Sequence, residues 1–205
     1  MHPNPVFHTA SAAENLAFAR SRAFGVLAVS AEAGAPLLSH VPFLLSAEGT
    51  EVDLHLVRSN PIARALGSPR PARLAVSGPD SYVSPDWYGV EDQVPTWNYV
   101  AVHLTGTLEL RPQAELRGLL DRLSDQFETR LLPKTPWRSD KMEPEALARM
   151  MRAIVPVQLR VEAVDGTWKL AQNKPEAARL GAAEGVATQG IGAELAALAA
   201  LMRGA

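Results

Sequence analysis

One stretch of the chain combines an arginine with the start of a helix, which is chemistry suited to a phosphate. A strand over residues 51 to 57 runs directly into Arg58-Ser59-Asn60-Pro61. Asn60 is a good N-cap residue and Pro61 suits the first helical position, so a short helix is predicted to begin at Pro61. Free amides, the helix dipole and a guanidinium would together attract an anion. The alternative is a surface arginine beside an ordinary helix start.

A second stretch offers flat rings on one side of a strand. The side chains of residues 94 to 110 should alternate between the two faces of a strand. One face would carry Trp97, Tyr99, Ala101 and His103, and the other Asn98, Val100, Val102 and Leu104. A strand that packs on its aliphatic face and presents aromatic rings on the other suits a planar ligand. The alternative, which the sequence leaves equally open, is an aromatic cluster that closes the end of a barrel.

Other familiar chemistry is missing from the sequence. The glycine-rich loops of dinucleotide sites and P-loops do not occur. The five histidines, which are His2, His8, His40, His55 and His103, show no metal-ligand spacing, and the chain has no cysteine. Ser39-His40 and Ser84 match no nucleophile motif. We therefore predict no metal site and assign no catalytic residue.

Composition narrows the class of protein. A chain of 205 residues can form one domain, or one domain with a small appendage. A net charge of −2 gives no broad attraction to nucleic acid or to anionic lipid. The absence of cysteine fits a reducing compartment, and neither a signal peptide nor a membrane-spanning run is recognisable. A cytoplasmic protein without a membrane partner is the expectation.

The first half of the chain reads as one helix followed by strands. Ser11 and Glu14 form a capping box before a predicted helix over residues 12 to 22. Strands are predicted over residues 24 to 30, 37 to 45, 51 to 57 and 71 to 77. Pro42 cannot donate to a ladder, so the second strand should lie at an edge or be bulged. Gly78-Pro79-Asp80 should end the fourth strand in a turn. The aromatic strand should bend at Gly106.

The second half mixes helices with a hairpin. An amphipathic helix is predicted over residues 113 to 131, and another opens at Pro144 with Leu147, Met150, Met151 and Ile154 facing inward. Strands over residues 155 to 163 and 167 to 170 should be joined by a turn at Asp165-Gly166. The tail should contain one helix, with Leu195, Leu198 and Met202 on its apolar side.

These elements predict a mainly β protein with peripheral helices. Strands and helices do not alternate regularly, which argues against a parallel sheet and favours an antiparallel barrel. The barrel domain is expected over residues 1 to 175. A helical tail over residues 176 to 205 should pack on the same domain or on a partner subunit.

Several segments together resemble the PaiB-type FMN-binding negative transcriptional regulator family. They include Pro3-x-Pro5-x-Phe7, Ser39-His-Val-Pro-Phe-Leu-Leu45 and His55-x-x-Arg58-x-Asn60-Pro61. The most specific are Gly78-Pro-x-x-Tyr-Val-Ser-Pro-x-Trp-Tyr88, Val94-Pro-Thr-Trp-Asn-Tyr-Val-Ala-Val-His103 and Lys169-Leu-Ala-Gln-Asn-Lys174. The resemblance runs in order from about residue 3 to residue 175.

The resemblance implies a split-barrel, flavin-reductase-like fold related to the pyridoxamine-phosphate oxidases, with FMN bound between the subunits of a homodimer. By analogy Arg58, Ser59 and Asn60, with His55 and Pro61 beside them, would hold the FMN phosphate. Ser39 and His40 would lie along the isoalloxazine or ribityl chain. The other implied cofactor-binding residues are Trp97, Asn98, Tyr99, Lys169, Gln172 and Asn173. The sequence departs from the family pattern at Ser59, where alanine is more usual, and at Ala171, where serine is.

Three functions follow from these observations. The first is an FMN-dependent oxidoreductase, in which the protein supplies binding and orientation. The second is a flavin-sensing negative regulator of transcription, although the sequence contains no DNA-reading element and direct DNA binding is not expected. The third is a related split barrel that binds haem or another planar ligand, with His103 or His40 offering an axial nitrogen.

Overall fold

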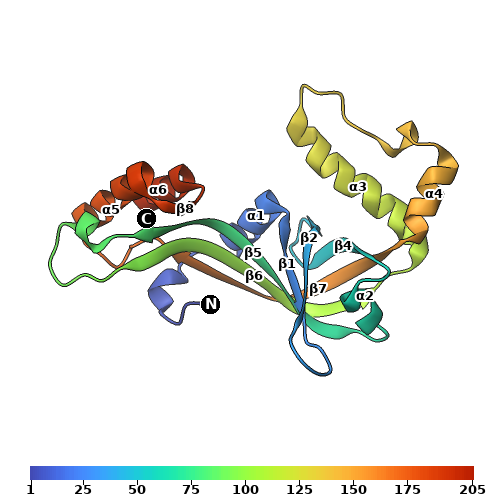
Figure 1. Cartoon of the computed structure of the whole chain (residues 1–205), viewed down its shortest axis with the longest axis horizontal. Helices are drawn as coiled ribbons and strands as arrows, with labels where there is room; N and C mark the ends of the chain where they lie inside the picture. The colour runs from blue at the N-terminus through green and yellow to red at the C-terminus, as the bar shows by residue number, and fades with distance from the viewer. The chain divides into compact units, whose positions relative to one another are not determined.

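A computed structural model describes residues 1 to 205, which fall into two compact units. Unit 1 contains Met1–Phe18, Val76–His103 and Asp165–Ala205, and unit 2 contains Ala19–Ala75 and Leu104–Val164. The helices are α1 (Ala12–Arg22), α2 (Pro61–Ala65), α3 (Leu116–Glu128), α4 (Pro144–Arg152), α5 (Glu176–Gln189) and α6 (Leu195–Gly204). The strands are β1 (Phe24–Val29), β2 (Leu37–Pro42), β3 (Leu44–Leu45), β4 (Glu51–Val57), β5 (Arg70–Val83), β6 (Thr96–Leu110), β7 (Ile154–Lys169) and β8 (Ile191–Ala193). The ribbon in Figure 1 is coloured along the chain.

All the strands belong to one sheet of order β2-β1-β5-β6-β7-β4-β3, with β8 paired to β5. The pairs β1–β2, β1–β5, β3–β4, β4–β7 and β5–β8 are antiparallel. The strands β5, β6 and β7 are long enough to contribute residues to both units. The predicted antiparallel sheet with added helices is confirmed.

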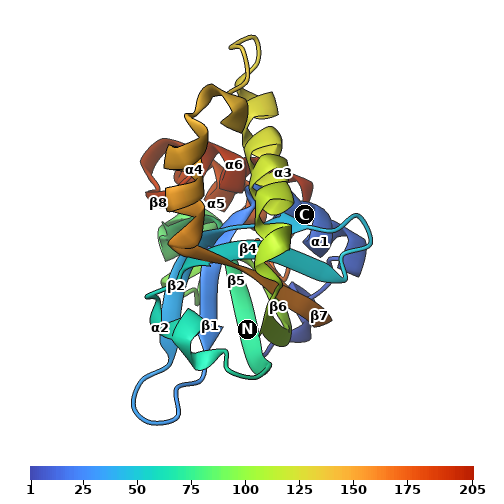
Figure 2. The ribbon, with the colours of Figure 1, turned by 90° about the vertical axis from the view of Figure 1, so that its right-hand side faces the viewer.

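Unit 2 is a curled half-barrel because of how its chain connects the sheet ends. The strands β2 and β3 lie at opposite ends of the strand order, yet only Phe43 separates them in sequence. The sheet must therefore curl until its ends meet, and β2 does lie against β4 (Figure 2). Phe43 is fully buried and its amide donates to the carbonyl of Ala23 at 3.0 Å. Pro42 ends an edge strand, as predicted.

Alternation explains which faces of the strands are buried. Val52, Leu54 and Leu56 of β4 are buried while their neighbours are partly or fully exposed. The same period of two holds in β1 and along β6. The N-terminus of α1 is fixed as predicted, because the amide of Glu14 donates to the Ser11 hydroxyl at 3.2 Å and the amide of Ser11 donates to the Glu14 carboxylate at 2.7 Å.

Two predicted turns are wrong. Gly78-Pro79-Asp80 lies inside β5, and Asp165-Gly166 lies inside the continuous strand β7. The glycines serve close contacts: a Cβ on Gly78 would lie 2.5 Å from the Phe18 ring, and one on Gly166 would lie 2.0 Å from Oδ1 of Asn15. Glycine in a strand can mark a place where another group packs closely against the backbone. That is the role of both glycines here.

The helices between β6 and β7 agree with the predicted positions but not with every predicted face. α3 buries Leu116, Leu119 and Leu123, as its spacing predicted. α4 begins at Pro144 as expected, yet none of its side chains is buried, and Met150 is 61% exposed. The inward placement is therefore wrong for Met150, whereas Met151 is half-buried. None of the helices combines the length and apolar character needed to cross a membrane.

The C-terminal segment contains two helices where one was predicted. α6 buries Leu198 and Met202 as expected, and it packs with α5 in a cluster that includes Val83, Tyr88 and Val100 of the same unit. Figure 1 shows α5 and α6 side by side. The helix α5 gave a weak signal because three of its five buried residues are alanines, which are Ala178, Ala182 and Ala183. The helix accommodates Trp87, whose indole would lie 2.3 Å from a Cβ on Gly185.

Two helical glycines provide a matched test of this packing. Gly185→Ala should destabilise the protein by about 1–3 kcal/mol, because overpacking against the indole exceeds the gain in helix propensity. Gly118→Ala in α3, where the added Cβ meets only Arg122 Nη1 at 3.6 Å, should stabilise by about 0.5–1 kcal/mol. Urea unfolding measures both changes. Equal effects of the two substitutions, or a penalty at Gly185 that persists in a Trp87→Ala background, would contradict this packing.

Candidate functional site

The exposed aromatic face of β6 lies in unit 1. Trp97 is 47% exposed and Tyr99 is half-buried, whereas the alternate residues Asn98 and Val100 are buried. An open hollow of about 320 Å³ runs along this part of β5 and β6, lined by Ser77, Gly78, Asp80, Trp97, Tyr99, Val100 and Ala101. The indole therefore does not fill the core. Its exposure leaves a flat surface on which a planar ring could stack.

Asn98 lies on the opposite, buried face of β6. It is 1% exposed, and its Nδ2 contacts the Met202 sulfur at 3.6 Å under α6. Its Oδ1 has no hydrogen-bond partner. The structure thus separates Asn98 from the rings of Trp97 and Tyr99, although the three are consecutive in sequence.

Lys169, at the end of β7, brings a cation to the aromatic face. Trp168 packs in the same cluster as Val100, so strand alternation directs Lys169 to the other face, which Trp97 and Tyr99 share. Its ammonium group donates to the Trp97 carbonyl at 2.8 Å and to the Thr96 hydroxyl. Burial, and then the charge of Lys174, lower the pKa of Lys169. No carboxylate is among the groups that shift it.

The two remaining predicted residues of unit 1 differ in role. The Gln172 side chain accepts from the amide of Leu170 at 2.8 Å and donates to the carbonyls of Trp168 at 2.6 Å and Val6 at 3.1 Å. These contacts hold the N-terminal segment against the end of β7, which is a structural task. Asn173 is exposed.

The predicted phosphate stretch lies in unit 2, and its arginine is already engaged. Arg58 Nε donates to the Arg152 carbonyl at 3.1 Å, and Nη2 donates to Gln113 Oε1 at 3.1 Å and to the Ile154 carbonyl at 3.4 Å. The guanidinium thus caps the carbonyl end of α4, where a cation is favourable. Ser59, by contrast, is exposed.

Asn60 forms the N-cap that was predicted for α2. Its Oδ1 accepts from the amide of Ile62 at 2.8 Å, and Pro61 takes the first helical position. Its Nδ2 donates to the Ser39 hydroxyl at 3.1 Å. The structure therefore brings Ser39 to Asn60 and fixes the turn that presents Ser59.

The two predicted histidines of unit 2 differ in exposure, His40 being exposed and His55 half-buried. Register pairs His40 with Val26 and Ser39 with Leu27, so these neighbours point to opposite faces of β2. The exposed His40 ring stacks on Phe24 with centroids 6.4 Å apart. Burial lowers the pKa of the half-buried His55, whose Nδ1 has no partner. In the β4–β7 ladder the backbone of His55 pairs with Pro156, which has no backbone N–H to donate.

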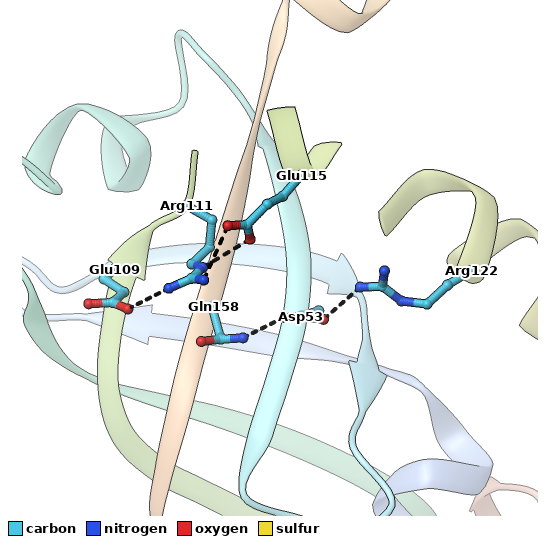
Figure 3. Close-up of polar contacts among 6 residues, drawn as sticks. All are labelled: Asp53, Glu109, Arg111, Glu115, Arg122 and Gln158. Atoms are coloured by element: carbon cyan, nitrogen blue, oxygen red, sulfur yellow. Dashed lines mark hydrogen bonds and ion pairs between the residues drawn. The ribbon is translucent and has the colours of Figure 1, made fainter. Parts of the chain in front are cut away.

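A charged hollow of about 240 Å³ beside α3 does not qualify as a ligand site. Figure 3 shows that Arg122 pairs with Asp53 at 2.9 Å, and that Arg111 pairs with Glu115 at 3.1 Å and Glu109 at 3.3 Å. Gln158 completes the network by donating to Asp53 at 2.9 Å. Each cation already has a carboxylate, so the hollow offers little net attraction to an anion.

Residues 1–163 match the family described as "Putative FMN-binding domain". The chain belongs to this family. A curated relative, the protease synthase and sporulation protein PAI 2 of Bacillus subtilis, is 30% identical over 172 residues, which are 83% of this chain and 81% of that protein.

Solved structures show the same fold at low sequence identity. The FAD and heme binding protein of Mycobacterium smegmatis aligns with a TM-score of 0.55 and 20% identity, covering 78% of this chain and 72% of that one. The conserved hypothetical protein Rv2991 of Mycobacterium tuberculosis aligns with a TM-score of 0.57 and 16% identity, covering 85% and 94%. At these identities the likeness establishes the fold alone.

Sequence reasoning missed two neighbours of Lys169. Thr96 accepts from its ammonium, and Lys174 lies close enough to lower its pKa. The spacing of five between the lysines, across the end of β7, gave no periodic signal. Phe7, whose ring lies 5.9 Å from Lys169 Nζ, is distant in sequence and could be placed only by the fold.

The titration of Lys169 tests this geometry. After reductive ¹³C-methylation, NMR should show one lysine with a pKa below the usual range, and Lys174→Met should raise that pKa because the neighbouring charge is gone. Lys134→Met, which removes a lysine paired with Glu128, should leave it unchanged. An unshifted Lys169, or a shift that Lys174→Met does not reduce, would contradict the arrangement.

Proposed function

We propose that this chain binds FMN, with the isoalloxazine ring on the face of β6 that carries Trp97 and Tyr99. The observation that supports the proposal most strongly is the exposure of these two rings beside an open hollow, while the alternate residues of the strand are buried. Aromatic faces stack on planar heterocycles, and the rest of the strand packs rigidly behind them. Membership of an FMN-binding domain family agrees with this chemistry.

The residues present fit such a ligand. The Lys169 ammonium lies next to the Trp97 backbone and offers a positive charge without a carboxylate to neutralise it. Flavin, when bound, supplies electron-transfer chemistry that the side chains themselves lack. The chain's own contribution is therefore to bind, orient and shield the ring.

Within unit 2, the proposed phosphate-binding residues are Arg58, Ser59 and Asn60. The Ser59 hydroxyl is exposed, and the turn that presents it is fixed by Asn60 through its bonds to Ile62 and Ser39. Arg58 anchors the same turn to the end of α4 and adds positive charge there. His40 and His55 are the other predicted site residues of this unit.

A flavin-dependent redox protein is the activity that this binding supports, and flavin-sensing regulation is the second. The name of the B. subtilis relative associates that protein with protease synthesis and sporulation. For this chain, regulation would be exerted through the flavin-bound state and a partner protein. A specific, salt-dependent gel shift with purified protein alone would contradict that indirect route.

Flavin titration of dialysed protein tests the proposal. FMN should bind saturably with quenched flavin fluorescence, and Trp97→Ala should weaken binding by roughly tenfold or more, since stacking on an aromatic ring contributes about 1–3 kcal/mol. Trp137→Ala, at another exposed tryptophan in the loop after α3, is the matched control and should bind normally. Arg58→Ala should weaken FMN binding while leaving riboflavin binding unchanged.

Absence of FMN binding to the folded wild-type protein would overturn the proposal. If the same protein instead gave a haem Soret band that was lost in His40→Ala or His103→Ala, the ligand would be haem. Equal weakening by Trp97→Ala and Trp137→Ala would remove the ring assignment and leave flavin binding unexplained.

We propose further that two copies associate through the exposed face of β1 and β2. Leu38 is 62% exposed and Phe24 is 52% exposed, and both lie on the face of this sheet edge that carries His40. Large exposed apolar side chains grouped on one sheet face are typical of an interface. Each copy would place His40 at that interface.

Light scattering tests the association. The wild-type protein should have the mass of a dimer, and Leu38→Glu should shift it to a monomer, because the carboxylate would be buried without a partner. Leu180→Glu, at an exposed leucine of α5, is the control and should remain dimeric. A wild-type monomer at all concentrations would rule the dimer out.

A further inference from the structure

Unit 1 holds two half-buried lysines that lack carboxylate partners. Lys169 donates to the Trp97 carbonyl and the Thr96 hydroxyl, and Lys174 donates to Gln93 Oε1. Each ammonium also lies over an aromatic ring, Lys169 at 5.9 Å from Phe7 and Lys174 at 5.4 Å from Tyr88. All these partners are neutral.

It is unusual for a partly desolvated cation to have no negatively charged partner. A partly buried charge is normally paired, because desolvation without an opposite charge is costly. The more exposed Lys134, by contrast, forms an ion pair with Glu128. Lys169 and Lys174 instead repel one another, and this repulsion contributes to the lowered pKa of Lys169. An anion bound between them would relieve the repulsion and replace the lost solvation.

The surroundings add neutral hydrogen-bonding capacity and rigidity. The Thr96 hydroxyl accepts from Lys169, so its own hydrogen remains for donation to a ligand. Gln93 donates to the Glu91 carbonyl at 2.9 Å, which orders the loop that reaches Lys174. Burial raises the pKa of Tyr88, so its ring stays neutral beneath the ammonium of Lys174. His2, whose ring lies 4.7 Å from that of Phe7, is a further group next to Lys169.

We propose that Lys169 and Lys174 form a binding site for a phosphoryl group, with Thr96 as an additional donor. Two ammonium groups match the charge of a phosphate better than that of a single carboxylate, and lysine binds phosphate as a point charge. The phosphoryl group could come from FMN itself or from a second phosphorylated ligand. The inference does not rest on flavin binding, because it concerns groups that bind phosphate whether or not a flavin ring is present.

Calorimetric titration of flavin-free protein with inorganic pyrophosphate tests the site. Binding should be saturable and should weaken with rising salt. Lys169→Gln and Lys174→Gln should each reduce affinity roughly tenfold or more, because a charge-assisted contact is lost. Lys134→Gln is the matched control and should bind like the wild-type protein. Lys174→Arg, which preserves the charge, should retain most of the affinity.

The source of the phosphoryl group is found by repeating the titration with FMN and riboflavin. If pyrophosphate displaces FMN, and Lys174→Gln weakens FMN but not riboflavin, the pair holds the FMN phosphate in place of Arg58, Ser59 and Asn60. If pyrophosphate binds equally well to FMN-saturated protein, the pair serves a second phosphorylated ligand. Both results support the site.

Failure of this inference is distinguishable from failure of flavin binding. If FMN does not bind but pyrophosphate does, the lysine site stands and the flavin proposal falls. Circular dichroism establishes that the wild-type protein and all variants are folded. If pyrophosphate then does not bind the wild-type protein, the inference is overturned. Equal pyrophosphate affinity in the wild-type, Lys169→Gln and Lys174→Gln proteins would also overturn it.

Discussion

The burial of one face of β6 is the constraint on which the rest of the structure depends. This strand is central in the sheet order, and Val100, Val102, Leu104 and Leu108 are all buried along it. Because side chains alternate, fixing that face leaves Trp97 and Tyr99 on the other one. A shift of register by one residue would bury the rings and expose the valines. The rings can therefore remain exposed without loss of the core, and this is what makes them available to a ligand.

A second constraint acts in unit 2, where a single residue joins the two ends of the sheet. Phe43 lies between β2 and β3 and is fully buried, and its carbonyl accepts from Gln126 of α3 at 3.2 Å. The curl that this connection imposes holds β2 against β4. It also brings Ser39 of β2 within hydrogen-bonding distance of Asn60, after the end of β4. The turn that carries Ser59 is thus a consequence of how the barrel closes.

Local rules predicted the features that local forces determine. The capping box at Ser11, the N-cap at Asn60 and the alternation along β6 depend on neighbours a few residues away, and all three are present. Gly78 and Gly166 were misread because their reason lies in Phe18 and Asn15, which are distant in sequence. The helix α5 was missed for a similar reason, because the glycine on it is explained by its packing against Trp87, which is distant in sequence.

The candidate site shows the same division. Residue types indicated the rings of β6 and the turn at Asn60, yet the sequence could not show that Arg58 caps α4 or that Asn98 lies under α6. Nor could it show that Lys174 acts on Lys169, because that proximity arises from the fold after β7 ends. Hydrogen bonds and packing contacts of this kind show which residues stabilise the fold and which remain available to a ligand.

The most direct test of the central claim is a crystal structure of the protein grown with FMN. We expect electron density for the isoalloxazine ring against Trp97 and Tyr99, with Asn98 still buried beneath α6. A flavin ring bound elsewhere, with Trp97 and Tyr99 in contact only with solvent or with protein, would contradict it.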